Sequence, residues 1–269
     1  MNRIEARFAD LRREGRKGLV GFLTAGDPGP AESARHVRTA LDNGVDVLEL
    51  GVPFSDPTAD GPVIQVAAQR ALAAGMTVAG VLDLVRAVRP DYPDVPIVLF
   101  GYTNPFYRYG YERLCAEAAA AGVDGLLVVD MPFEESDELA GPLAEHDLCR
   151  IPLVAPTTPP ARVPTILQGA RGFVYYIMFR GVTGTRAELA GDLRQNVAAL
   201  RAGTTLPIAV GFGVSTGAQA RLAGEGADAV VVGSAFVAAA AAGQLAERVR
   251  EIRAALDEPA RGTPGLMGA

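Results

Sequence analysis

Strand-length apolar runs alternate with longer amphipathic segments along nearly the whole chain, and this alternation constrains the fold more than any other feature. The pattern predicts a parallel sheet covered by helices. We expect eight strands, at Leu19–Thr24, Val47–Gly51, Ile97–Tyr102, Leu126–Asp130, Ile151–Val154, Phe173–Ile177, Ile208–Gly211 and Ala229–Gly233. We expect helices at Arg3–Arg13, Pro30–Asp42, Val78–Val88, Tyr111–Ala121, Glu134–Asp147, Asp192–Arg201, Gly217–Ala223 and Gln244–Leu256.

A weak internal repeat supports this interpretation. Asn43–Asp46, Ala121–Asp124 and Glu225–Asp228 each place a glycine two residues before an aspartate, directly ahead of an apolar run. Such a glycine can end a helix in the left-handed conformation before a strand begins. No Gly-x-Gly-x-x-Gly follows the first strand, and Gly-rich or polar loops follow the strands throughout. The sequence therefore predicts an α/β fold, a single (β/α)₈ barrel with an extra N-terminal helix, over residues 1–256 and a flexible tail over residues 257–269.

Composition narrows the function classes. The net charge of −6 argues against a nucleic-acid binder, which would display a basic surface. Cys115 and Cys149 are too few for a disulfide framework. No apolar stretch follows the charged opening residues, and the Ala/Val-rich runs are interrupted before they could span a bilayer. We expect a cytoplasmic protein.

Glu49 is the most informative single residue, because it interrupts the apolar run Val47–Gly51. A carboxylate there is costly to bury unless it faces a polar cavity or has partners. One interpretation is an edge-strand glutamate that points to solvent. The other is an acid or base lining the barrel, with a pKa set by its surroundings.

A second carboxylate follows in the loop Pro53–Pro62, which prolines, Gly61 and small polar residues mark as a shaped turn. Asp60 could fold back over the strand end that carries Glu49. Asp56 and Pro57 are equally compatible with ordinary turn chemistry.

Two glycine-containing strand ends are candidates for a phosphate site. Gly211–Gly213 and the pair Gly233-Ser234 follow the seventh and eighth predicted strands. Glycine permits close backbone approach, and amides at the start of the next helix favour an anion. This is a frequent phosphate location in barrels. Gly181–Arg186 could be a mobile lid or an ordinary loop.

Other chemistries find less support in the sequence. His36 and His146 lie far apart, and no spacing resembles a zinc site, so we expect no metal. Lys17 is the only lysine and precedes the first strand, at the barrel face opposite the usual active site. A Schiff-base mechanism is therefore disfavoured, which leaves acid–base chemistry by carboxylates.

These segments together resemble the tryptophan synthase α subunit family over nearly the whole chain. The resemblance rests on Phe22–Pro28, Glu49 with Pro53–Gln65, Tyr102–Pro105, Asp130–Pro132, Ala155–Pro159, Gly181–Gly184, Gly211–Gly213 and Gly233-Ser234. It implies a lyase that splits indole-3-glycerol phosphate into indole and glyceraldehyde 3-phosphate by a retro-aldol reaction.

The resemblance also implies residue roles. Glu49 would protonate the indole C3 carbon and help remove the glycerol hydroxyl proton, while an ionised Asp60 would stabilise the charge on the ring. Thr183 would orient Asp60. The indole would lie among apolar residues and the phosphate would take backbone amides: the matching positions are Phe22, Ile64, Phe100, Leu127, Leu153 and Tyr175 for indole, and Gly184, Gly213, Gly233 and Ser234 for phosphate.

The family implies a partner as well. Indole would pass through a tunnel to a β subunit that carries pyridoxal phosphate, in an α–β–β–α assembly, and this chain itself would need no cofactor. The interface would involve five loop positions, Asp56, Pro57, Asn104, Pro132 and Glu134. One departure is Met178-Phe179, where the family usually has a serine shortly before the lid. It puts lid movement and coupling to a partner in question.

Three other functions stay open at this stage. A stand-alone indole-3-glycerol phosphate lyase would share fold and site but work without a β subunit. Another phosphate-binding barrel, acting on a sugar phosphate, is disfavoured by the apolar pocket beside the two carboxylates. A degenerate α-type subunit that only activates its partner is disfavoured because Glu49 and Asp60 are both present.

Overall fold

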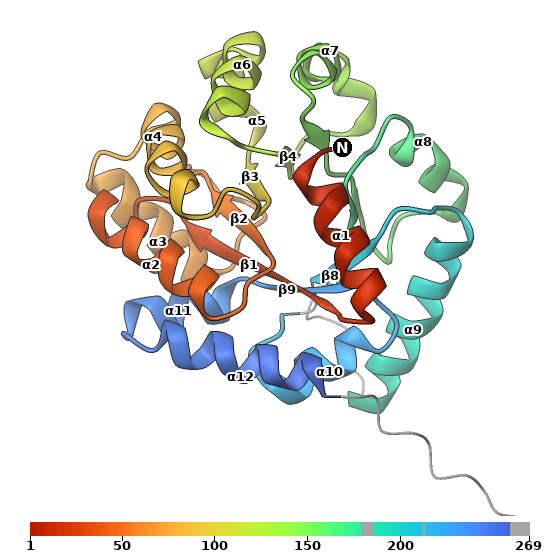
Figure 1. Cartoon of the computed structure of the whole chain (residues 1–269). Helices are drawn as coiled ribbons and strands as arrows, with labels where there is room; N and C mark the ends of the chain where they lie inside the picture. The colour runs from red at the N-terminus through yellow and green to blue at the C-terminus, as the bar shows by residue number, and fades with distance from the viewer. Residues whose placement is uncertain (179–185, 212, 259–269) are drawn as a thin grey trace, which may run out of the picture.

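All strands of the fold run parallel in one curled sheet (Figure 1). The structure is a computed structural model that describes residues 1–178, 186–211 and 213–258. Within these ranges the strand order is β5-β4-β3-β2-β1-β9-β8-β7-β6. The strands are β1 (Gly18–Thr24), β2 (Val47–Gly51), β3 (Ile97–Gly101), β4 (Gly125–Val128), β5 (Cys149–Arg150), β6 (Leu153–Val154), β7 (Val174–Ile177), β8 (Ile208–Gly211) and β9 (Ala229–Val232).

The sheet closes on itself through β5 and β6, which are two pieces of one strand. Ile151 donates a backbone hydrogen bond of 3.0 Å to Leu126 at β4, and the carbonyl of Pro152 accepts one of 2.9 Å from Tyr175 at β7. Pro152 has no amide hydrogen to donate to a ladder, which accounts for the break. The predicted (β/α)₈ barrel is confirmed, but its fifth strand, predicted as continuous over 151–154, begins at Cys149 and is interrupted.

Helices surround this sheet, and α1 lies across one end of the barrel (Figure 1). The helices are α1 (Arg3–Glu14), α2 (Pro30–Asp42), α3 (Pro62–Ala73), α4 (Val78–Val88), α5 (Thr103–Tyr109), α6 (Tyr111–Ala121), α7 (Asp137–Glu145), α8 (Val163–Leu167), α9 (Arg186–Ala202), α10 (Gly217–Gly224), α11 (Ser234–Ala241) and α12 (Leu245–Asp257). Short 3₁₀ turns are η1 (Arg89–Asp91), η2 (Phe133–Glu135) and η3 (Pro160–Arg162).

The helix predictions are largely confirmed, with two kinds of difference. The segment predicted as one helix from Glu134 is divided into η2 and α7, with Ser136 between them. Four helices had no counterpart in the prediction: α3, α5, α8 and α11. Three of these, α3, α5 and α8, carry proline in their first turn, where a missing amide hydrogen costs nothing.

Side chains alternate between two cores along each strand. In β1, Leu19 and Leu23 pack outward against the helices, whereas Val20 points into the barrel interior. The same alternation in β2 sends Leu48 and Leu50 outward. Since successive strand residues point to opposite faces, Glu49 must point into the barrel. The fold therefore fixes the direction of this carboxylate.

Two further features of the described chain concern its cysteines and the lengths of its helices. Cys115 in α6 and Cys149 in β5 are buried and free. Within the described part of the chain, no single helix is long and apolar enough to cross a membrane. The segments 62–73 and 78–91 meet the length and composition criteria only as a pair bent by 94°.

Candidate active site

Glu49 lies in the middle of β2 and is completely buried. Its backbone neighbours in the sheet are Phe22 of β1 and Val98 of β3. Among the described residues, neither carboxyl oxygen of Glu49 has a hydrogen-bond partner. The side chain therefore enters the barrel interior without the partners that a structural buried carboxylate normally has. The alternative of an edge-strand glutamate in contact with solvent is excluded.

This burial changes the chemistry of Glu49. Removal from water disfavours the charged form and raises the pKa of the carboxyl to about 8. A glutamate with such a pKa is protonated at neutral pH and can both give and take a proton there. The environment-tuned acid predicted from the sequence has a physical cause in this burial.

Asp60 lies half-buried at the barrel mouth, in the loop between β2 and α3. The Tyr102 hydroxyl donates a hydrogen bond of 3.0 Å to its Oδ2 atom. The same hydroxyl accepts one of 3.0 Å from the backbone amide of Ala59, so it holds the loop at two points. Burial raises the pKa of Asp60, and the hydrogen bond from Tyr102 opposes that shift.

Tyr102 is a site residue that the sequence analysis did not single out. We expect Tyr102→Phe to raise the pKa of Asp60, because the hydrogen bond that favours the carboxylate is lost. If an ionised Asp60 is needed, the acidic limb of the kcat/KM profile moves to higher pH for the substrate that the sequence resemblance implies, indole-3-glycerol phosphate. On that limb, below the midpoint of the parent, kcat/KM should fall by about tenfold or more, since a hydrogen bond to a charged group contributes about 1.5–3 kcal/mol.

Tyr107→Phe is the matched control, because Tyr107 is 63% exposed on nearby α5 and has no role in the site. Its pH profile should match that of the parent. An unchanged acidic limb in Tyr102→Phe would show that Tyr102 does not support the ionised form of Asp60.

Apolar side chains from five strands and one helix surround the carboxylates. The rings of Phe22 and Phe100 meet edge to face at 5.2 Å, and those of Phe100 and Tyr175 lie 6.4 Å apart. Leu127 pairs with Phe100 across β3 and β4, and Leu153 pairs with Tyr175 across β6 and β7. Together with Ile64 of α3, which packs against Phe22, the structure brings all six predicted indole-contacting residues to one region.

A small pocket joins Asp60 to these apolar residues. Its walls include Phe22, Ile64 and Phe100 beside Asp60 and Tyr102. Thr24 also lines the pocket, and its buried hydroxyl has no hydrogen-bond partner within the described ranges. Burial raises the pKa of the Tyr175 hydroxyl, and the negative charges of Glu49 and Asp60 add to that shift, so both carboxylates lie near this ring. The two carboxylates therefore lie in the same part of the barrel, with Asp60 lining this pocket and Glu49 buried behind its apolar walls.

Because Gly51 has no side chain, the Phe22 ring can occupy the space beside it. A Cβ atom at Gly51 would lie 2.4 Å from the Phe22 ring, closer than any real contact. The strand that carries Glu49 therefore ends in a residue without a side chain because an aromatic ring crosses over it.

The candidate phosphate site lies at the ends of two adjacent strands. Gly213 follows β8 with a positive φ of 60°, which glycine adopts without strain. Gly233 and Ser234 form the start of α11 directly after β9. A Cβ atom at Gly233 would meet Phe22 and Ile64 at 3.7 Å, so this helix start borders the apolar pocket. Gly184, Thr183 and the proposed lid lie outside the described residues.

The predicted interface residues lie on one rim of the barrel. Asp56 and Pro57 follow β2, and Pro132 and Glu134 follow β4. Asn104 was predicted in a loop, and this is wrong: it lies in helix α5 after β3, exposed to solvent. Because β2, β3 and β4 are neighbours in the sheet, all five positions share the same edge.

Three further expectations can be compared with the structure. Met178 is buried in the outer core between sheet and helices, so its side chain does not enter the site, and Phe179 lies outside the described residues. Lys17 precedes β1 at the opposite rim, where its Nζ donates a hydrogen bond of 2.7 Å to the Ala227 carbonyl. In the part of the chain that is described, no group of three His, Cys, Asp or Glu side chains is placed to hold a metal.

Fold and site together define a class: parallel (β/α)₈ barrels that carry carboxyl groups, here Glu49 and Asp60, among apolar side chains of the barrel. Comparison with known proteins identifies the family. Residues 8–261 match the family model described as tryptophan synthase alpha chain. The chain belongs to this family of lyases, which act in tryptophan biosynthesis.

Relatives and solved structures agree with this assignment. The tryptophan synthase alpha chain of Laribacter hongkongensis is 50% identical over 263 residues, covering 96% of this chain and all of the relative. That of Gluconacetobacter diazotrophicus is 52% identical over 238 residues, 88% of this chain and 87% of the relative. The crystal structure of the Legionella pneumophila alpha chain superimposes with a TM-score of 0.87 at 37% identity, covering 96% and 98% of the two chains.

Proposed function

We propose that this chain cleaves indole-3-glycerol phosphate to indole and glyceraldehyde 3-phosphate as an α subunit. The observation that carries the proposal is Glu49, a completely buried carboxyl with a pKa of about 8 among the apolar residues of the barrel interior. An indole ring is flat and apolar, and its C3 carbon must receive a proton before the side chain can leave. A protonated glutamate in an apolar pocket suits that step.

In the proposed mechanism Glu49 moves two protons. It gives its proton to indole C3, which leaves a positive charge delocalised onto the ring nitrogen. The bond between C3 and the glycerol side chain then breaks, and its electrons neutralise the ring. The hydroxyl on the carbon that leaves becomes the aldehyde as its proton passes to Glu49. The carboxyl ends protonated, as it began, so no external acid is consumed.

Asp60 stabilises the charged intermediate. Its carboxylate accepts a hydrogen bond from the indole N–H and lies close to the charge that protonation at C3 creates. Tyr102 keeps this carboxylate in place through the hydrogen bond to Oδ2. Thr183 would orient Asp60 further when substrate is bound.

We expect Asp60→Asn to lower kcat/KM for the cleavage by about 10²-fold, in the range that mutagenesis gives for lost electrostatic stabilisation of a transition state. An amide can hold the ring N–H but carries no charge to oppose the developing cation. The assay is indole release without a partner subunit. Asp56→Asn, in the same loop but exposed and hydrogen-bonded to Ser55, should stay within about threefold of the parent. Equal losses in both variants would remove the special role of Asp60.

The remaining pocket residues hold the substrate. Phe22, Ile64, Phe100, Leu127, Leu153 and Tyr175 would enclose the indole ring. The phosphate would bind backbone amides at Gly213, at Gly233 and Ser234, and at Gly184. The start of α11 supports this assignment, since helix N-termini attract anions without needing a basic side chain.

We further propose that the chain works in the cytoplasm with a β subunit in an α–β–β–α assembly. Pyridoxal phosphate would be held by the β subunit, and this chain would need no cofactor or metal. The rim formed by Asp56, Pro57, Asn104, Pro132 and Glu134 would contact the partner. Residues 1–256 would form the one catalytic domain, followed by the tail 257–269.

Indole release from indole-3-glycerol phosphate by the purified chain, with and without a tryptophan synthase β subunit, tests the proposal. Slow release that the β subunit accelerates supports an α subunit coupled to its partner. Fast release that ignores the β subunit would instead indicate a stand-alone lyase. No release, combined with stimulation of the β reaction, would indicate a degenerate subunit that only activates its partner.

A further inference from the structure

A cavity that neither Glu49 nor Asp60 lines lies where the barrel wall opens between β4 and β6. β4 pairs with β5 only at Gly125 and Leu126, and β6 pairs with β7 alone. No backbone pairing joins Val128 to Leu153 within the described residues. A cavity of about 370 Å³ occupies this opening. We call it the seam pocket.

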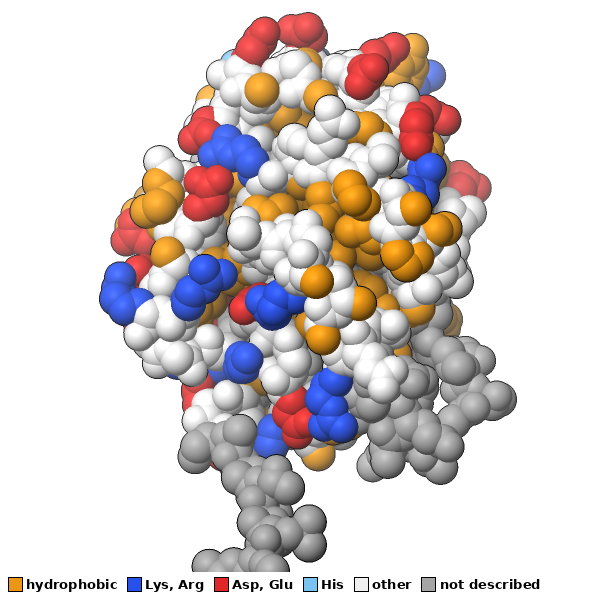
Figure 2. All heavy atoms as spheres, turned by 90° about the vertical axis from the view of Figure 1, so that its right-hand side faces the viewer, with side chains coloured by type: hydrophobic (Ala, Val, Ile, Leu, Met, Phe, Trp, Pro, Cys, Tyr) orange, Lys and Arg blue, Asp and Glu red, His pale blue; other side chains and the backbone are white. Residues whose placement is uncertain are grey.

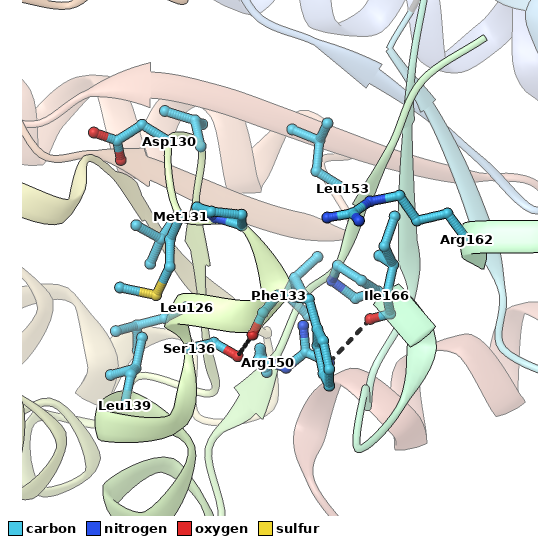
Figure 3. A pocket seen from close by; sticks show the side chains of 15 residues that line it. Leu126, Asp130, Met131, Phe133, Ser136, Leu139, Arg150, Leu153, Arg162 and Ile166 are labelled. Atoms are coloured by element: carbon cyan, nitrogen blue, oxygen red, sulfur yellow. Dashed lines mark hydrogen bonds between the residues drawn. The ribbon is translucent and has the colours of Figure 1, made fainter. Parts of the chain in front are cut away.

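The walls of the seam pocket come from segments on both sides of the opening (Figure 3). One side is formed by the loop after β4, η2 and α7, and the other by β5, β6, η3 and α8. Its walls are mixed: Leu126, Met131, Leu139 and Ile166 are among the apolar residues, and the polar side chains are Asp130, Ser136, Arg150 and Arg162. Figure 2 looks onto the side of the molecule that carries α8 and shows hydrophobic side chains in the middle of that face, with charged ones around them. The volume falls in the range of small-molecule sites.

Arg150 supplies a positive charge within these mixed walls. Its Nη2 donates to the carbonyls of Ile166 and Gln168, at 3.1 and 2.6 Å, at the C-terminal end of α8. Its Nε and Nη1 atoms have no hydrogen-bond partner, and no carboxylate pairs with it, within the described residues. Burial lowers the pKa of Arg150 with no charged group to oppose the shift. The Arg150 guanidinium is thus a cation whose Nε and Nη1 groups can still donate hydrogen bonds to a ligand.

An aromatic side chain lies against the same cation. The Phe133 ring has the Arg150 guanidinium 5.3 Å from its centre, and Figure 3 shows both in the middle of the pocket. The Ser136 hydroxyl donates 2.7 Å to the Phe133 carbonyl and helps fix η2 at this position. The pocket therefore offers a flat apolar surface beside a guanidinium edge.

The other arginine of the pocket is already neutralised. Arg162 pairs with Glu134 at 2.7 Å, and both side chains are about half exposed at the rim. This pair links η3 to η2 across the opening, but its charge is balanced. Asp130 also lines the pocket, away from Arg150 in Figure 3, and its Oδ1 accepts hydrogen bonds of 2.7 and 2.9 Å from the Thr103 amide and hydroxyl. Arg150 is therefore the cation with unused donors that would hold an anionic ligand.

We propose that the seam pocket binds a small aryl carboxylate, with the ring against Phe133 and the apolar walls and the carboxylate on the free donors of Arg150. Arginine suits this ligand because its fork matches the two oxygens of a carboxylate. Neither Glu49 nor Asp60 lines the pocket, but Leu153, assigned above to the indole, and Pro132, assigned above to the partner rim, do.

The test uses 3-phenylpropionate as probe and its uncharged amide as the matched compound. Met131 lines the pocket, whereas Met76 and Met178 are buried in the outer core, so methyl-labelled methionine gives both a reporter and references. We expect saturable shifts of the Met131 methyl signal with the acid, unchanged signals of Met76 and Met178, and at least about tenfold weaker binding of the amide.

Two variants distinguish a specific role of Arg150 from the effect of removing any positive charge from the pocket. Arg150→Met should weaken binding of the acid at least about tenfold, whereas Arg162→Gln should change it by less than about twofold. An unchanged Met76 signal confirms that Arg150→Met is folded, and the comparison of acid with amide needs no variant. Equal binding of acid and amide, no saturable Met131 shift, or equal losses in both variants would overturn the proposal. None of these outcomes depends on whether the chain cleaves indole-3-glycerol phosphate.

Discussion

Glu49→Gln should lower kcat for cleavage of indole-3-glycerol phosphate by about 10³- to 10⁴-fold, near the upper end of what one acid–base group contributes. Glutamine has nearly the same shape but cannot give a proton to indole C3 or take one from the glycerol hydroxyl. Because the apolar walls and the start of α11 are unchanged, the affinity for substrate should stay within about threefold of the parent. Single-turnover kinetics give the rate, and calorimetric titration of the variant gives the affinity.

Glu49→Asp separates position from chemistry. Aspartate keeps a carboxyl but withdraws it by one methylene from the centre of the barrel. Partial activity in this variant, with none in Glu49→Gln, is expected if proton transfer is the role. If Glu49→Gln loses affinity for substrate and keeps its turnover rate, the acid–base role assigned to Glu49 is wrong.

The stability of Glu49→Gln relative to the parent should rise by about 1.4 kcal/mol per pH unit between pH ~5 and pH ~8. In the folded chain Glu49 holds its proton up to about pH 8, while in the unfolded chain it releases it near the ordinary value of 4.5. The folded state therefore binds more protons across this window, so the stability of the parent falls as pH rises through it. The effect is complete once pH exceeds the folded pKa.

Urea denaturation of both chains at several pH values measures this difference. Taking the difference removes the pH dependence that the two chains share, such as that of Asp46 and Asp124. Over the window the relative gain should reach a few kcal/mol, of the order of a third of the stability of an ordinary domain. A difference that stays constant from pH ~5 to pH ~8 would mean that Glu49 titrates in the folded chain as it does in water.

Much of the fold could be predicted because the spacing of apolar residues along the sequence shows which face of each strand or helix is buried. The alternation of Leu48, Glu49 and Leu50 in an apolar run already implies a carboxyl on the opposite face from two outward leucines. The helices α3 and α5 could not be recognised in the same way. Pro62 and Asn104-Pro105 resemble turn sequences, yet proline is accepted in the first turn of a helix, and only packing against the barrel decides between the two.

The parts of the site that escaped prediction depend on contacts between distant segments. The hydrogen bond from Tyr102 to Asp60 joins residues 42 positions apart, and no local sequence pattern predicts it. Asp60 was expected to stay ionised, but burial moves its pKa upward and only Tyr102 opposes the shift. The seam pocket likewise arises because β5 pairs with β4 whereas β6 pairs with β7. This pairing is a property of the closed sheet and cannot be recognised in either segment alone.

The central claim is that burial keeps Glu49 protonated near neutral pH in the folded chain. Its most direct test is a carboxyl-¹³C NMR titration of glutamate-labelled chain, with the Glu49 signal assigned by its absence in Glu49→Gln. The structure predicts that this signal titrates near pH 8, far above those of exposed glutamates. A Glu49 signal that titrates near 4.5 would contradict the account, because the proton needed at indole C3 would then be absent from the resting enzyme.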